Sequence, residues 1–76
     1  MEISFEFIKN YIKDRESIYS LIDIRNLLER VIDYKEYYPE RLLPEEYKKY
    51  KLTIKECNSL ISICNRKIRN LSRVGE

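Results

Sequence analysis

The last third of the chain reads YKKYKLTIKECNSLISICNRKIRNL from Tyr47 to Leu71, and its apolar side chains recur alternately three and four residues apart. This is the heptad spacing of helices that pack side by side in bundles and coiled coils. It predicts one long helix over residues 45–72, which begins after Pro44. The packing or dimer seam of this helix consists of Tyr47, Tyr50, Ile54, Cys57, Ile61, Cys64, Ile68 and Leu71.

A second amphipathic stretch precedes this helix, over residues 17–37. Leu21, Ile24 and Leu28 follow helical spacing, and further apolar side chains widen the stripe enough to contact more than one neighbour. Pro39 ends the stretch because the residue before a proline is pushed out of helical geometry. The short connector makes the two long helices antiparallel neighbours, so we expect a helical hairpin.

The N-terminal residues predict a shorter helix over residues 4–13. Ser4 can cap it by accepting a hydrogen bond from a free backbone N–H. Residues 13–17 are all polar and interrupt the apolar stripe, which leaves two interpretations. We favour a break with a new helix after it, and the alternative is one continuous helix that exposes this stretch to water. No alternating strand pattern occurs, so the fold class is all-α.

The length of 76 residues allows a single all-helical domain over residues 1–76. A chain this short buries only about 60% of its unfolded surface and is marginally stable alone. Because the two amphipathic faces exceed what one hairpin can cover, we expect a homodimer that forms a helical bundle. A heteromeric assembly stays open, as does the choice between a parallel and an antiparallel dimer.

The composition argues against an enzyme. There is no His, which removes the usual general base and the commonest metal ligand, and a single Gly excludes glycine-rich phosphate loops. We therefore expect no catalytic residues, no cofactor and no metal. Cys57 and Cys64 are two helical turns apart, about 10 Å, which is too far for a disulfide within one helix. We expect buried reduced thiols, with an intersubunit disulfide or redox switch as the alternative.

Seven tyrosines are an unusual feature of so short a chain. Tyr34, Tyr37 and Tyr38 lie at the end of one predicted helix, and Tyr47 and Tyr50 lie at the start of the next. Both groups should meet at one end of the hairpin. We predict an aromatic plug there, and the alternative is a partner hot spot formed by Tyr34, Tyr37 and Tyr38. Base stacking is a third possibility.

Charge is distributed unevenly along the chain. Residues 1–46 contain seven basic and eleven acidic side chains, whereas residues 47–75 contain eight basic and one acidic. The basic set could complement the acidic first half internally, bind phosphate, or bind an acidic protein. The candidate nucleic-acid contacts are Lys48, Lys49, Lys51, Lys55, Arg66, Lys67, Arg69 and Arg73.

These observations predict a small non-enzymatic interaction protein, a regulator, adaptor or inhibitor that presents a helical face to a larger protein partner. The alternative is a nucleic-acid-associated transcriptional or nucleoid modulator that uses the basic C-terminal helix. No apolar run is long enough to span a membrane and no signal peptide is apparent, so we expect a cytoplasmic protein. The abundance of Ile, Lys, Tyr and Asn suggests an AT-rich genome, such as that of a virus or mobile element.

Overall fold

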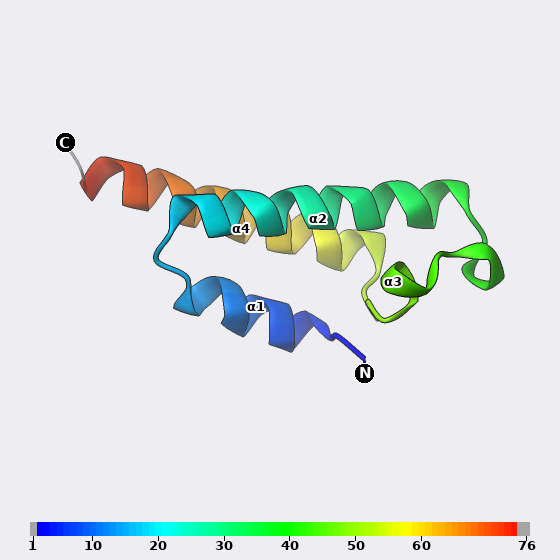
Figure 1. Ribbon diagram of the computed structural model, residues 1–76. Coiled ribbons are helices and arrows are strands. Elements are labelled where there is room, and N and C mark those ends of the chain that lie inside the picture. The colour runs from blue at the N-terminus through cyan, green and yellow to red at the C-terminus, as the bar shows by residue number, and fades with distance from the viewer. Residues whose placement is uncertain (1, 75–76) are drawn as a thin grey trace.

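The structure is a computed structural model, and it describes residues 2–74 (Figure 1). These residues form no strand, and the predicted all-α class is confirmed. Four α-helices and one 3₁₀ turn follow in the order α1 (Phe5–Asp14), α2 (Ile18–Tyr37), η1 (Glu40–Leu42), α3 (Glu45–Lys48) and α4 (Ile54–Val74). In Figure 1, α2 and α4 lie side by side and run in opposite directions, and α1 lies beneath them.

Local capping chemistry sets the ends of α1 and α2. Ser4 Oγ accepts a hydrogen bond from the N–H of Phe7 at 3.3 Å, and Ser17 Oγ accepts one from Ser20 at 3.4 Å. Each cap satisfies a backbone donor that has no partner within its helix. The favoured break before residue 18 is thus confirmed, and α1 lies within one residue of its predicted bounds. Tyr38 is extended ahead of Pro39 and ends α2.

The single helix expected over residues 45–72 is wrong. The chain instead forms the short α3, which ends at the C-cap Lys49, continues as a non-helical connector over residues 50–53, and begins α4 at Ile54. A reciprocal capping box starts the new helix: Thr53 Oγ1 accepts from the Glu56 N–H at 3.0 Å, and Glu56 Oε1 accepts from the Thr53 N–H at 2.9 Å. Tyr47 and Tyr50 therefore precede α4, although both are buried.

The extended segment before α1 pairs with the connector between α3 and α4. The Ile3 N–H donates to the Lys49 carbonyl at 2.7 Å, and the Lys51 N–H donates to the Ile3 carbonyl at 2.9 Å. These two bonds form an isolated parallel bridge between Ile3 and Tyr50. They give hydrogen-bond partners to backbone groups outside the helices, and they fix the start of α1 against the connector.

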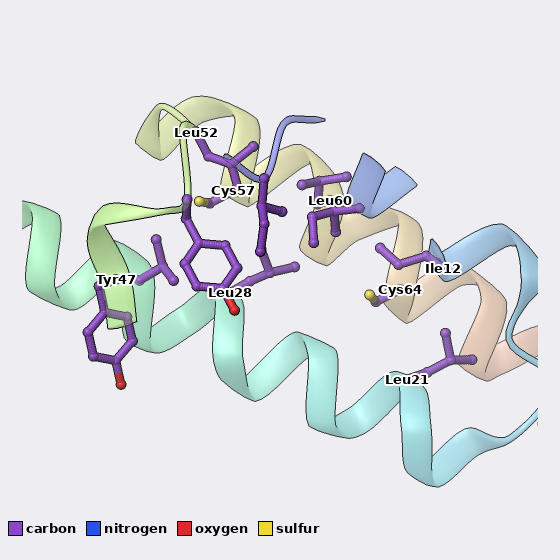
Figure 2. Close-up of a cluster of buried hydrophobic side chains, with 12 residues drawn as sticks. Ile12, Leu21, Leu28, Tyr47, Leu52, Cys57, Leu60 and Cys64 are labelled. Carbon is purple, nitrogen blue, oxygen red and sulfur yellow. The ribbon is translucent and has the colours of Figure 1, made fainter. Parts of the chain in front are cut away.

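The core lies where α4 meets α2 on one side and α1 on the other. Figure 2 shows Cys57, Leu60 and Cys64 pointing into the space between these helices. Cys57 and Cys64 of the predicted seam are fully buried, and so is Leu60, which lies beside the seam. The seam residues Ile61 and Ile68 are only half-buried. The seam is therefore rotated from its predicted position. The fully buried side chains are Ile12, Leu21, Leu28, Val31, Cys57, Leu60 and Cys64.

Among residues 2–74, no helix combines the length and the apolar character needed to cross a bilayer.

Candidate interaction surfaces

The tyrosines of α2 and α3 meet at one end of the molecule. The rings of Tyr34 and Tyr47 stack with centroids 4.4 Å apart and an interplanar angle of 23°. Tyr38 also stacks on Tyr34, with ring centroids 5.5 Å apart and an interplanar angle of 27°. Tyr50 is buried in the core instead, where desolvation raises its pKa. The structure thus places Tyr34 and Tyr47 in an aromatic plug.

The same end leaves three large apolar side chains exposed. Tyr37 is 78% exposed, Tyr38 is 48% exposed, and Leu42 of η1 is 59% exposed. Tyr37 and Tyr38 also line a shallow hollow of about 130 Å³ together with Tyr34 and Asp33. We refer to Tyr37, Tyr38 and Leu42 as the aromatic end.

Three of the eight candidate nucleic-acid contacts have partners within the chain. Lys48 pairs with Glu45 at 3.3 Å, one turn earlier in α3. The ammonium of Lys49 lies 5.5 Å from the centroid of the Tyr50 ring, within the range of a cation–π contact. Lys67 is the third, and it joins α4 to α1 through hydrogen bonds to backbone carbonyls.

The exposed cations of α4 share one side of the helix. At 100° per residue, Lys55, Arg66, Arg69 and Arg73 fall within about 60° of arc. All four are exposed, and they extend over about 27 Å of helix axis. We refer to these four residues as the basic stripe. Within residues 2–74 no ion pair joins α2 to α4, so the structure shows no ionic pairing between the two long helices.

A groove lies between α1 and the second half of α4, and it has a volume of about 520 Å³. Ile12, Ile63 and Leu71 provide its apolar lining. Its polar lining residues are Lys9, Lys13, Arg66, Lys67 and Asn70. We refer to this feature as the basic groove. Sequence reasoning missed Lys9 and Lys13 because nothing in their local pattern indicates which face of α4 they approach.

Lys67 joins the two walls of the basic groove. Its Nζ donates to the Ile12 carbonyl at 2.9 Å and also to the Lys13 carbonyl. Both acceptors belong to the last turn of α1. The Ile12 carbonyl also accepts a hydrogen bond from the Arg15 N–H at 3.2 Å, and the Lys13 carbonyl is one of those that helix geometry leaves without a partner within the helix. A cation at this position also interacts favourably with the helix dipole. Lys67 therefore has a structural role that its place in the basic set does not suggest.

Cys57 and Cys64 are free thiols, and both are buried on α4. Burial raises the pKa of Cys64 to about 11, partly opposed by the charge of Arg25. Burial also raises the pKa of Cys57, opposed by Lys35 and reinforced by Glu56. Raised pKa values keep both thiols protonated and weakly nucleophilic near neutral pH. In the part of the chain that the structure describes, no group of three or more acidic or thiol side chains is arranged to hold a metal ion.

Comparison of the chain with protein-family models, with curated proteins and with solved structures gives no match. The functional proposals below therefore rest only on the surfaces of the molecule.

Proposed function

We propose that the protein is a small non-enzymatic interaction protein, a regulator, adaptor or inhibitor, and that it contacts a larger protein through the aromatic end. The observation that carries this proposal is the exposure of Tyr37, Tyr38 and Leu42 within six residues of one another. Large apolar side chains gathered on a surface are typical of contact sites. Tyrosine is enriched at binding hot spots because it joins a large apolar body to a polar tip.

Tyr38, one residue of the aromatic end, is held by ring stacking within the chain. Tyr38 stacks on Tyr34, and Tyr34 stacks in turn on the buried Tyr47. Fixing these rings in advance reduces the side-chain entropy that a complex would lose on forming. The stack thereby supports a binding surface at this end, with Tyr37 as its most exposed aromatic ring.

Site-specific photo-crosslinking in the native host tests this proposal. Benzoylphenylalanine replaces Tyr37 in one variant and Tyr19 in a matched control, since Tyr19 is 81% exposed at the opposite end of α2. We expect a crosslink to a different protein from position 37 and none of comparable yield from position 19. Equal crosslinking from both positions, or none from either, would contradict the proposal.

We propose a homodimer as the assembly state. Ile61, Ile68 and Leu71 are half-buried in a single chain, so a second copy could cover the area that remains. Light scattering over a concentration series tests this assembly, and a compact monomer at high micromolar concentration would rule it out.

We also place the protein in the cytoplasm, because free thiols are typical of reducing compartments. A viral or mobile-element origin accounts for the composition.

The second candidate function is binding to nucleic acid, and the basic stripe is the observation that favours it. Four exposed cations on one side of α4 could contact successive phosphates. Four such contacts would lower the affinity by about 10²-fold between 50 and 200 mM salt. Titration of labelled DNA and RNA at both salt concentrations tests this alternative, and absent binding at 50 mM salt would eliminate it.

A further inference from the structure

The basic groove has a regular arrangement of charged and apolar side chains. Lys9 and Lys13 are four residues apart on α1, and Arg66 and Asn70 are four residues apart on α4. Residues at this spacing lie one above the other on a helix, about 6 Å apart along its axis. Two polar rows therefore flank an apolar lining that includes Ile63.

The basic groove contains an unbalanced positive charge. Four cations line it, Lys9, Lys13, Arg66 and Lys67, and no carboxylate does. The one ion pair among residues 2–74 joins Lys48 to Glu45, outside the groove. Like charges collected in a concave surface raise the local positive potential, which attracts an anionic occupant.

The basic groove faces away from α2. Arg25 of α2 donates a hydrogen bond to Asn65 of α4 at 3.1 Å, which marks the side of α4 that α2 covers. At 100° per residue, Ile63 and Asn70 lie about 140–160° around the helix from Asn65. An occupant of the groove would therefore contact α1 and α4 without displacing α2.

We propose that the basic groove binds an acidic amphipathic helix of a partner protein. The apolar stripe of that helix would pack on Ile63 and Leu71, and its flanking carboxylates would face the two polar rows. Recognition of an amphipathic helix by a hydrophobic groove is a recurrent mode of protein binding. Carboxylates three or four residues apart on the ligand helix match the spacing of Lys9 and Lys13.

The arrangement favours a helix over other anions. The headgroup of a single lipid is a compact charge, and it would leave the cations of one of the two rows without a partner. A nucleic-acid backbone supplies phosphates but no apolar stripe for Ile63 and Leu71. Charge on both sides and an apolar centre are the combined features of an acidic amphipathic helix.

The test uses the full chain, labelled with ¹⁵N, and three synthetic peptides of equal length. One peptide has a leucine stripe flanked by glutamates, the second has the same stripe flanked by lysines, and the third has the glutamate composition in scrambled order. We expect the glutamate-flanked peptide alone to shift the amide resonances of Lys9, Lys13, Ile63 and Asn70. Binding should weaken with added salt, since exposed charges carry part of the affinity.

Two variants test whether the polar rows provide the contacts. Lys9→Glu with Lys13→Glu should weaken binding by at least about tenfold, because two attractive contacts become repulsive. Asn70→Glu, on the opposite row, should weaken it by about threefold. The matched control is Lys51→Glu with Lys55→Glu, which changes the net charge equally at exposed positions outside the groove. The control should change affinity by less than about twofold.

Several outcomes would overturn the proposal. One is that the lysine-flanked or scrambled peptide binds as well as the glutamate-flanked peptide. The others are amide shifts confined to other surfaces, and no amide shift with the glutamate-flanked peptide at millimolar concentration. Vesicles rich in phosphatidylglycerol that shift the same amides and displace the peptide would assign the groove to lipid instead. The basic groove is separate from the aromatic end, so a missing crosslink at Tyr37 leaves this proposal standing, and failure here leaves the other standing.

Discussion

Lys67→Met removes the charged contact between α4 and α1 while keeping most of the aliphatic side chain. In the native protein the Lys67 ammonium donates to the carbonyls of Ile12 and Lys13 at the end of α1. Methionine preserves the packing of the stem, so the variant isolates the loss of the charge and its hydrogen bonds. We expect the protein to remain folded but to become less stable.

The size of the effect follows from the surroundings of the two carbonyls. A hydrogen bond from a charged donor contributes about 1.5–3 kcal/mol. The bond to the Ile12 carbonyl is partly buried and retains this value, whereas the bond to the Lys13 carbonyl is exposed and adds little. We therefore expect a loss of about 1.5–3 kcal/mol. A chain of this length has a total stability of only about 4–11 kcal/mol, so the loss is a large fraction of it.

Urea unfolding followed by circular dichroism measures the loss. With a slope of about 1 kcal/mol per molar, the midpoint should fall by about 1.5–3 M. Hydrogen exchange should show the larger loss of protection in α1 rather than at the centre of α4, because the lost contact anchors α1. Lys55→Met is the matched control, since Lys55 is exposed on the same helix, and it should change stability by less than about 0.5 kcal/mol. An effect of Lys67→Met no larger than that of the control would refute the reasoning.

Four further predictions concern the core. Leu60→Ala should destabilise the protein by about 2–5 kcal/mol in urea unfolding, and clearly more than Ile61→Ala, because Leu60 is fully buried and Ile61 is not; equal losses would contradict the rotated seam. The Cys64 thiol should resist a thiol reagent at pH 8 until the chain is unfolded. Because the pKa of Cys64 is raised to about 11, the folded state binds more protons than the unfolded state above about pH 9. The free energy of unfolding should therefore fall as the pH rises from about 9 towards 11, and Cys64→Val should reduce that slope. An unchanged slope in the variant would contradict the assignment of this pH dependence to Cys64. A double-mutant cycle between Tyr34 and Tyr47 should give a coupling of about 0.5–1.5 kcal/mol, reflecting the stacked rings, and zero coupling would show that the stack contributes nothing.

The helix ends that depend on local chemistry were predictable from the sequence. Ser4, Ser17 and Pro39 act within a few residues of their own positions, and each ends or begins a helix as expected. The break before α4 also had a local signal that the heptad interpretation overlooked. Thr53 and Glu56 have the spacing of a capping box, but the continuing three and four spacing of apolar residues suggested an uninterrupted helix.

The rotated seam arises from the number of neighbours that α4 has. A strict heptad seam describes a helix that faces one partner along its length. Here α2 and α1 cover different sides of α4, so the most buried line lies between their contacts and passes through Leu60. The position of α1 depends on contacts between residues more than fifty positions apart, such as Lys67 and Ile12. Periodicity within one helix contains no information about such contacts.

The attachment of α1 at both ends explains why the basic groove can be tested by substitution. The Ile3 bridge fixes the chain before α1, Ile8 and Ile12 bury its centre, and Lys67 holds its last turn. None of these three anchors uses the side chain of Lys9 or Lys13, both of which are exposed. Reversing their charge should therefore alter what the groove attracts while leaving its shape intact. Walls that are fixed in this way would reduce the conformational entropy lost when the proposed helix binds.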